Sequence, residues 1–267
     1  MCELLGISTG TPIRIGLSMA RLAAHGDPAR HLGDGWGVAL HDGADAFVVR
    51  LPEPAIQSPW VHAVETLYQP ISLAIAHIRR ATRGKVTLRN TQPFCRELGG
   101  RLHVFAHNGD LPGLLDHARI PGARFQPIGD TDSEMAFCGL MERLADLWSS
   151  GLPSLIARHQ VIADYASTLR VLGPANFLYT DGDALFAHAD RRTQADGSIA
   201  APGLVLLNHA GNDDGTFPSH PIMNQRAAAA AGPAVTFASV PLSDEPWEAL
   251  PQGALIAVQR GRILVRG

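Results

Sequence analysis

The sequence predicts an α+β domain in which antiparallel sheets are layered with helices. Strand-like runs come first, two neighbouring helical segments follow, and strand-like runs then resume. Short turn sequences join several of the strand-like runs, which is typical of antiparallel hairpins. The chain has 267 residues, of which 46% are hydrophobic, so a sizeable core can be buried. We therefore expect a single domain over residues 2–267.

The apolar runs of the first half are short and suit buried strands. Glu3–Ser8 is the first of them. The spacing of Ile15, Met19 and Leu22 then predicts a helix over residues 13–24. A His-Asp-Gly turn signal joins the first two of the later runs. These later strands are expected at Gly35–Leu40, Ala46–Arg50, Ser72–Arg79 and Leu102–Asn108.

Helical signals take over after residue 130. A capping box at 131–134 opens a helix with one apolar face, formed by Phe137, Leu140, Met141, Leu144 and Trp148. A second amphipathic helix spans Pro153–Leu172 and ends at a Gly-Pro pair. Residues 189–233 are rich in Gly, Ala, Asp and Pro and are interpreted as an irregular surface excursion. The later strands are expected at Asn176–Thr180, Ala184–His188, Leu204–Leu207, Val235–Ser239, Ala254–Gln259 and Ile263–Val265.

Composition excludes several classes of protein. The net charge is −3 and no basic run occurs, which argues against nucleic acid as a partner. No apolar run approaches the roughly 20 residues of a membrane span, and the N-terminus lacks a signal-peptide pattern. Three cysteines without paired spacing predict no disulfide framework, so we expect a cytoplasmic protein.

The histidines do not predict a metal centre. His103 and His107 are four residues apart, but the segment between them alternates like a strand, which places the two side chains well apart along one face. His-Glu-x-x-His and Cys-x-x-Cys motifs are both missing from the sequence. We expect neither a metal nor a cofactor.

Cysteine at position 2 is the most informative single residue. Because cysteine is small, we expect an aminopeptidase to remove Met1 and to leave Cys2 as the mature N-terminus. A terminal cysteine carries a thiol and a free α-amine, and the amine titrates near pH 7.7–8.0 in model peptides, at about the value a general base needs. Nucleophile and base would then share one residue. The alternative is that a cysteine occupies position 2 by chance.

Four further segments complete a pattern behind Cys2. They are Asp34-Gly35-Trp36-Gly37, Ala76-His77-Ile78-Arg79-Arg80-Ala81-Thr82, Ala106-His107-Asn108-Gly109-Asp110 and Gly129-Asp130-Thr131-Asp132-Ser133-Glu134. In this order, the set resembles the class II glutamine amidotransferases, which are N-terminal-nucleophile hydrolases. The resemblance covers essentially the whole chain and is greatest to stand-alone members without a synthase domain. It implies a four-layer αββα sandwich with two antiparallel sheets.

The resemblance also implies roles for residues that bind the substrate. Arg79 matches the arginine that holds the α-carboxylate, which suits a guanidinium fork, although a surface ion pair at a strand end is the alternative. Asp132 matches the aspartate that pairs with the α-ammonium, yet acids are favoured in the first turn of a helix in any case. Thr82 matches a position near the substrate and is otherwise a simple strand residue. Arg80 receives no role, because many relatives carry an aromatic residue there.

Asn108 and Gly109 match the family's oxyanion hole. An amide side chain and a backbone N–H can both donate to a developing oxyanion. The alternative from local sequence is a type I′ hairpin turn at Asn-Gly.

At Gln92 the chain departs from a family pattern that usually has histidine, and this alters specificity only if the side chain contacts substrate. The glycines of 34–37 are expected to allow close packing beside the nucleophile strand, with Trp36 as a possible core aromatic.

The implied reaction is hydrolysis of the γ-amide of glutamine through a γ-glutamyl thioester on Cys2. One alternative is hydrolysis of a γ-glutamyl conjugate, as in ergothioneine biosynthesis. Residues 2, 79, 108 and 132 do not separate these two, because they act on the glutamyl half that both substrates share. Residue 92 and the excursion at 189–233 are where a difference could lie. A second alternative is a glutaminase-like binding or sensor module that supplies a partner synthase.

Overall fold

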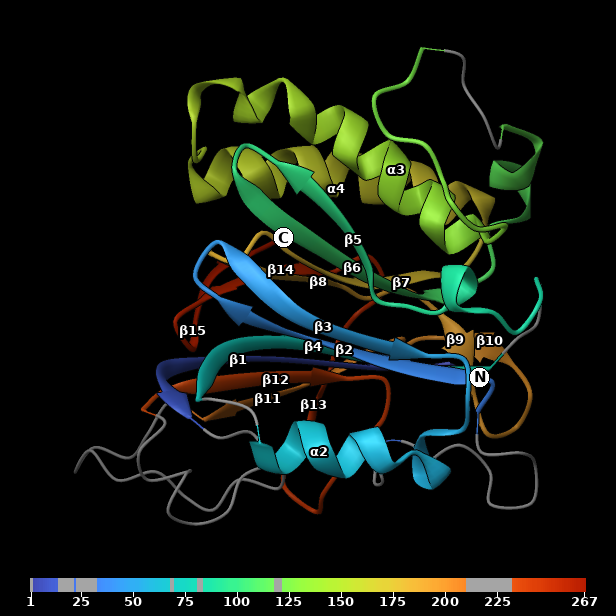
Figure 1. Cartoon of the computed structure of the whole chain (residues 1–267), viewed down its shortest axis with the longest axis vertical. Helices are drawn as coiled ribbons and strands as arrows, with labels where there is room; N and C mark the ends of the chain where they lie inside the picture. The colour runs from blue at the N-terminus through green and yellow to red at the C-terminus, as the bar shows by residue number, and fades with distance from the viewer. Residues whose placement is uncertain are drawn as a thin grey trace.

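Two β-sheets pack face to face, and helices cover the outer side of each, which gives four layers (Figure 1). The computed structural model describes residues 2–13, 22, 33–67, 70–80, 84–117, 122–209 and 232–267. Helix α2 (Pro59–Leu67) covers one sheet, and helices α3 (Asp132–Ala145) and α4 (Leu155–Leu172) cover the other. The expected αββα sandwich with two antiparallel sheets is confirmed. Short 3-10 helices are η1 (Ala55–Gln57), η2 (Leu88–Asn90), η3 (Pro112–His117) and η4 (Leu147–Ser150).

The first sheet has seven antiparallel strands in the order β13-β11-β12-β1-β4-β2-β3. Its central strand β1 pairs Glu3 with Ile78 of β4 on one side and Leu5 with Ala238 of β12 on the other. The start of the chain is therefore held next to the end of β4. The strands are β1 (Glu3–Ile13), β2 (Gly35–Asp42), β3 (Asp45–Leu51), β4 (Ile71–Arg79), β11 (Val205–His209), β12 (Ala234–Ala238) and β13 (Glu248–Ala249).

The second sheet has six antiparallel strands in the order β15-β14-β8-β7-β6-β5. Strands β6 and β7 pair to their ends, with Asn108 opposite Asn176 and Gly109 opposite Ala175. A separate two-stranded hairpin consists of β9 (Arg192–Thr193) and β10 (Ile199–Ala200). The six strands are β5 (Phe94–Leu98), β6 (Arg101–Gly109), β7 (Ala175–Thr180), β8 (Leu185–His188), β14 (Leu255–Gln259) and β15 (Arg262–Arg266).

The core between the sheets is apolar. Leu4 and Ile75 of the first sheet belong to the same buried cluster as Val104 and Leu178 of the second. Gly6 of β1 brings the sheets close together here, because an added Cβ would lie 3.0 Å from a methyl group of Leu178. Burial of such alternating faces is what holds two antiparallel sheets in one packing arrangement.

The capping box of α3 forms only in part. The hydroxyl of Thr131 accepts the N–H of Glu134 at 3.3 Å, as predicted. The Glu134 carboxylate does not return the bond to residue 131. It accepts the N–H of Gly129 at 2.6 Å and the guanidinium of Arg96 at 2.6 Å. The start of α3 is therefore tied to β5 as well as capped.

Most elements predicted from the sequence occur, with shifted ends, but the structure adds α2, β5 and the two-residue strands β9, β10 and β13, which were not predicted. Of the helix predicted for residues 13–24, Ile13 instead ends β1, Leu22 is helical and buried, and the rest lies outside the described residues. The excursion at 189–233 is more regular than expected, because β9 and β10 lie within it in addition to β11, which corresponds to the strand predicted at Leu204–Leu207. Residues 210–231 of the excursion lie outside the described residues.

The glycines of 34–37 do not pack beside β1, the strand that follows Cys2. Strand β2 pairs with β3 and β4, so β4 separates it from β1. A Cβ at Gly37 would collide with the carbonyl oxygen of Gln92, and one at Gly35 would lie 3.1 Å from the hydroxyl of Thr91. These glycines instead allow residues 91–93 to pack closely against β2. Trp36 is fully buried in the core, as its alternative reading proposed.

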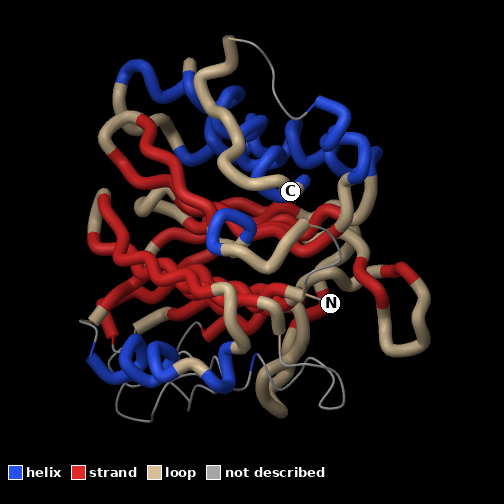
Figure 2. The backbone as a smooth tube through the Cα atoms, turned by 45° about the vertical axis from the view of Figure 1, so that its right-hand side comes forward, coloured by secondary structure: helices blue, strands red, loops and turns tan. Residues whose placement is uncertain are grey.

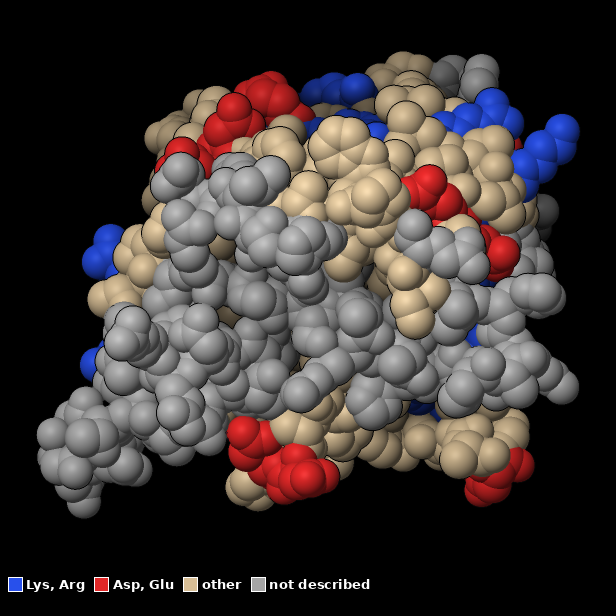
Figure 3. Space-filling model, turned by 60° about the horizontal axis from the view of Figure 1, so that its bottom comes forward, with Lys and Arg blue, Asp and Glu red and all other residues tan. Residues whose placement is uncertain are grey.

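The surface of the α2 side carries charges of both signs. In Figure 3 the Lys, Arg, Asp and Glu side chains of the described residues are scattered around the rim of this face, without a patch of one sign. Within the described part of the chain, no helix is long and apolar enough to cross a membrane.

Candidate functional site

Cys2 is anchored by the peptide groups of the neighbouring residue Arg80. The Arg80 N–H donates to Cys2 Sγ at 3.3 Å, and the thiol donates to the Arg80 carbonyl at 3.4 Å. The pairing of β1 with β4 creates this contact, because it places the start of one strand beside the end of the other. Burial raises the pKa of the Cys2 thiol, and the Arg80 N–H only partly counters this. The thiol thus requires a base to become a nucleophile near neutral pH.

Asn108 reaches Cys2 from the other sheet. Its side-chain nitrogen donates to the carbonyl oxygen of Cys2 at 2.6 Å and makes a longer contact of 3.4 Å with the hydroxyl of Ser239. The same hydroxyl accepts the N–H of Leu4 at 3.0 Å. The backbone carbonyl of Asn108 accepts the side-chain amide of Asn176 at 3.0 Å. The amide of Asn108 is therefore fixed over the start of β1.

Asn108 and Gly109 are strand residues, so the type I′ turn reading is wrong. Both belong to β6 and pair with β7, and neither has a positive φ. Such a turn requires φ above zero at both central residues. Gly109 is needed for a different reason, because a Cβ there would collide with the carbonyl oxygen of Pro174 and lie 2.6 Å from His107 Nε2.

A pocket of about 290 Å³ opens beside Cys2. Asn108 and Gly109 form one side of it, and the β9–β10 hairpin forms another. Figures 1 and 2 show this hairpin projecting beside the start of β1. Arg79 and Asp132 do not line the pocket. The described lining residues are Cys2, Arg80, Asn108, Gly109, Asp110, Pro174, Arg191, Arg192, Thr193 and Ile199.

Arg79 is buried at the end of β4, with 4% of its surface exposed, which does not fit a surface ion pair. Its guanidinium donates to the carbonyl of Gly84 at 3.3 Å. Burial lowers the pKa of Arg79, while the nearby Cys2 and Asp34 act in the opposite direction. A cation is thus held within electrostatic range of the thiol. Thr82 lies outside the described residues.

Asp132 occupies the first turn of α3 and is held by backbone groups. Its carboxylate accepts the N–H of Leu111 at 2.7 Å and that of Ser133 at 2.9 Å. The hydroxyl of Ser133 contacts His107 Nδ1 at 3.0 Å. Burial lowers the pKa of His107, although the charge of Asp132 raises it. Asp132 is thereby linked to the residue that precedes Asn108 in β6.

The side chain of Gln92 is engaged with backbone and does not line the pocket. It donates to the carbonyl of His107 at 3.1 Å and accepts the His107 N–H at 2.6 Å, so it satisfies both peptide groups as a neighbouring strand would. Gln92, the position at which the sequence departs from histidine, therefore holds β6 in place immediately before Asn108.

Comparison with known proteins places the chain in a family. The sequence profile of a family described as "Glutamine amidotransferases class-II" matches residues 1–267.

The chain belongs to the class II glutamine amidotransferases.

One relative, from Escherichia coli K12 and named "Putative glutamine amidotransferase YafJ", is 37% identical over 188 residues, which cover 70% of this chain and 72% of the relative. A crystal structure of a predicted glutamine amidotransferase from Pseudomonas aeruginosa PA01 is 28% identical, with a TM-score of 0.67 and coverage of 99% and 100% of the two chains. The glutamine PRPP amidotransferase of B. subtilis is 18% identical and shares the fold, with a TM-score of 0.62; the match covers 100% of this chain and 49% of that one.

Two residues near Cys2 of this class II amidotransferase were not predicted. Arg192 donates to the carbonyl of Ser239 and, at 3.1 Å, to the Glu3 carboxylate. Ser239 in turn contacts both Leu4 and Asn108. These residues lie far apart in sequence and meet only when the β9–β10 hairpin and the end of β12 come together beside β1. No local pattern marks them.

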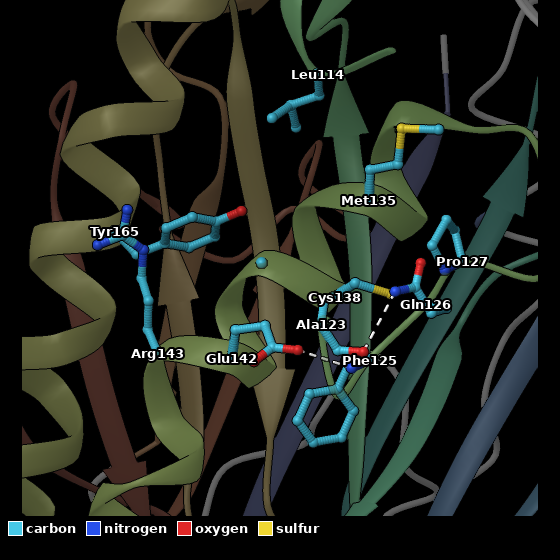
Figure 4. Close-up of a pocket in the computed structure, with 11 residues that line it drawn as sticks. Leu114, Ala123, Phe125, Gln126, Pro127, Met135, Cys138, Glu142, Arg143 and Tyr165 are labelled. Carbon is cyan, nitrogen blue, oxygen red and sulfur yellow. Dashed lines mark hydrogen bonds between the residues drawn. The ribbon is translucent and has the colours of Figure 1, made fainter. Parts of the chain in front are cut away.

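A larger pocket of about 460 Å³ lies in the outer helical layer of the class II fold. It is lined by residues such as Met135, Cys138, Arg143 and Tyr165 (Figure 4). Burial raises the pKa of the Cys138 thiol, and the Arg96 guanidinium lies 3.8 Å from its sulfur. We place the candidate functional site at Cys2, because its smaller pocket combines a thiol with an amide donor from the other sheet.

Among the described residues, no three His, Cys, Asp or Glu side chains cluster closely enough to hold a metal ion.

Proposed function

We propose that this class II amidotransferase hydrolyses the γ-amide of glutamine through a γ-glutamyl thioester on Cys2. The observation that carries the proposal is the contact of 2.6 Å between the Asn108 amide and the backbone of Cys2, two residues that both line the pocket. A nucleophile and a hydrogen-bond donor from two different sheets converge there, which is the arrangement that acyl transfer requires.

The α-amine of Cys2, once Met1 is removed, takes the thiol proton. Burial raises the pKa of the thiol, so such a base is needed at neutral pH. The sulfur attacks the γ-carbonyl carbon, and the developing oxyanion accepts from the Asn108 amide and the Gly109 N–H. We expect the Asn108 amide to give up its longer contact of 3.4 Å with Ser239 and to keep its bond to Cys2. Ammonia leaves with the proton, and water then releases glutamate.

Arg79 and Asp132 hold the two ends of the glutamate part. The guanidinium of Arg79 binds the α-carboxylate, and its burial strengthens this pairing by excluding water. Asp132 binds the α-ammonium and is pre-oriented by the N–H groups of Leu111 and Ser133. Thr82 lies near the substrate in this proposal.

The deciding experiment is mass spectrometry of the purified protein with glutamine. We expect release of glutamate and, after acid quenching, an acyl adduct on Cys2 with the mass of a γ-glutamyl group. The same assay repeated with γ-glutamyl amides separates the alternatives: a γ-glutamyl conjugate hydrolase turns over such amides but not glutamine, whereas a binding or sensor module turns over none of them. Absence of both glutamate and adduct would refute the proposal.

Removal of Met1 is expected to be essential for activity. A retained residue converts the Cys2 amine into an amide, which cannot act as a base. We expect a protein with an N-terminal tag to be inactive until a protease frees Cys2, as followed by intact mass and glutamate release. A protein tagged at the C-terminus is the control. Full activity of chains that retain Met1 would show that the amine is not the base.

Arg79→Lys is expected to raise the KM for glutamine by roughly tenfold, because a point charge replaces a fork that binds a carboxylate through two hydrogen bonds. Steady-state kinetics measures this, and Arg262→Lys on the exposed side of β15 is the control. An unchanged kcat/KM for glutamine in the Arg79 variant would show that another residue holds the α-carboxylate.

A further inference from the structure

The pocket beside Cys2 is not lined by the residues assigned to the glutamate part. It runs from Asn108 toward the β9–β10 hairpin and includes neither Arg79 nor Asp132. Three of its lining residues are arginines, Arg80, Arg191 and Arg192. Ammonia, the leaving group of glutamine, is small and has no anionic group that would need such a lining.

Arg192 is committed to the protein itself. Its guanidinium donates to the carbonyl of Ser239 and to the carboxylate of Glu3, and only 8% of the side chain is exposed. Its charge is therefore already paired with the carboxylate of Glu3. It positions the hairpin against the start of β1.

The guanidinium of Arg191 has fewer hydrogen bonds to the described residues than that of Arg192. Its Nε lies 3.7 Å from the carboxylate of Asp190 and makes no hydrogen bond to any described residue, although this atom is buried. The Asp190 carboxylate is already shared, since it accepts the N–H of Ala175 at 3.2 Å and the Nε of Arg170 at 3.4 Å. Because 35% of its side chain is exposed, Arg191 can still reach a ligand in the pocket.

Arg80 is fixed beside the nucleophile by its backbone alone. Its peptide N–H and carbonyl both contact Cys2 Sγ, while its guanidinium makes no hydrogen bond to the part of the chain that the structure describes. Asp110 is the one acidic residue among the described lining residues. The described lining of the pocket therefore includes two arginines with guanidinium donors left over, against one carboxylate.

We propose that this pocket is a leaving-group subsite for γ-glutamyl amines whose amine part carries an anion, a carboxylate being the simplest. The inference rests on the proposed function, since the γ-carbonyl carbon must lie at Cys2 Sγ. With the glutamate part on the side of Arg79 and Asp132, the scissile nitrogen and its substituent lie on the side of the hairpin. Guanidinium groups are suited to bind a carboxylate there.

The chemical step is unchanged in form. Sulfur forms a bond to the γ-carbonyl carbon, the carbon–nitrogen bond breaks, and the leaving amine takes the proton that the α-amine of Cys2 received from the thiol. Water then cleaves the γ-glutamyl thioester. The exposed Ile199 of β10 offers an apolar contact for the carbon chain between amine and anion.

The test compares two isosteric substrates, γ-glutamylglycine and γ-glutamylglycinamide, which differ in the charge of the leaving amine. We expect the wild-type kcat/KM to be about tenfold or more higher for γ-glutamylglycine, the gain typical of one hydrogen bond to a charged group. In Arg191→Gln and in Arg80→Gln this ratio is expected to fall toward one. Arg262→Gln is the matched control and should keep the wild-type ratio.

Three outcomes would overturn the inference. If the wild type hydrolyses glutamine but the ratio is near one, the subsite is wrong while the proposed function stands. If the arginine variants lower kcat/KM equally for both substrates, the pocket holds the glutamate part instead. If no γ-glutamyl compound is hydrolysed and no thioester forms, the proposed function fails and the subsite with it.

Discussion

Cys2→Ser is expected to lower turnover of glutamine by about a thousandfold or more while the fold is retained, since removal of a nucleophile has effects of this order. A serine hydroxyl is a far weaker nucleophile than a thiol at neutral pH. Its oxygen fits between the N–H and carbonyl of Arg80, so the packing at the start of β1 is preserved. Glutamate release and the melting temperature measure the two effects separately.

A glutamine-analogue electrophile tests the same residue without substitution. We expect it to label Cys2 and to spare Cys95 and Cys138. Burial raises the pKa of Cys95 to about 11 and also raises that of Cys138. Burial raises the pKa of Cys2 too, but its own α-amine is at hand to remove the proton. Peptide mapping that finds the label on Cys95 or Cys138 would move the active site elsewhere.

Asn108→Asp is expected to lower kcat by roughly two orders of magnitude or more, the scale of losing one oxyanion donor. The substitution keeps the shape of the side chain but places a carboxylate oxygen where the amide donates to Cys2 at 2.6 Å. Negative charge then faces the carbonyl of Cys2, the thiol and the developing oxyanion. KM is expected to change much less, because the donor acts mainly in the transition state.

The control for this variant is Asn208→Asp, which makes the same change at an exposed position of β11. Its kcat and KM are expected to match the wild type. Thermal unfolding of both variants separates loss of chemistry from loss of structure. If Asn108→Asp turns over glutamine within a few-fold of the wild type, the oxyanion assignment is wrong.

The regular elements were predictable where periodicity is strong. The hairpin signal between β2 and β3, the apolar face of α3 and the hydroxyl cap from Thr131 are all local patterns, and the structure contains each of them. Helix α2, which begins at Pro59, was missed because the exposed Trp60 weakens its apolar pattern. Strand β5 is short, and its burial alternates only weakly.

The site was predictable only in part. Position 2 and the motif around Asn108 are visible in the sequence, but their contact depends on the packing of two sheets. The turn that local sequence offers as an alternative for the Asn-Gly pair does not form, because pairing with β7 and the close carbonyl of Pro174 select an extended strand. The links through Ser239 and Arg192 join β1 to distant segments, so no local signal could reveal them.

Because Cys2 directly precedes a strand of one sheet and Asn108 lies next to the end of a strand of the other, the packing between the sheets sets the geometry of the chemistry. The thickness of the apolar layer, set by side chains such as Leu4 and Leu178, fixes how far the sulfur lies from the amide. A displacement of about 1 Å can cost roughly a hundredfold in rate, whereas a repacked core often loses little stability. Turnover is therefore expected to respond more strongly than the melting temperature when this core is repacked.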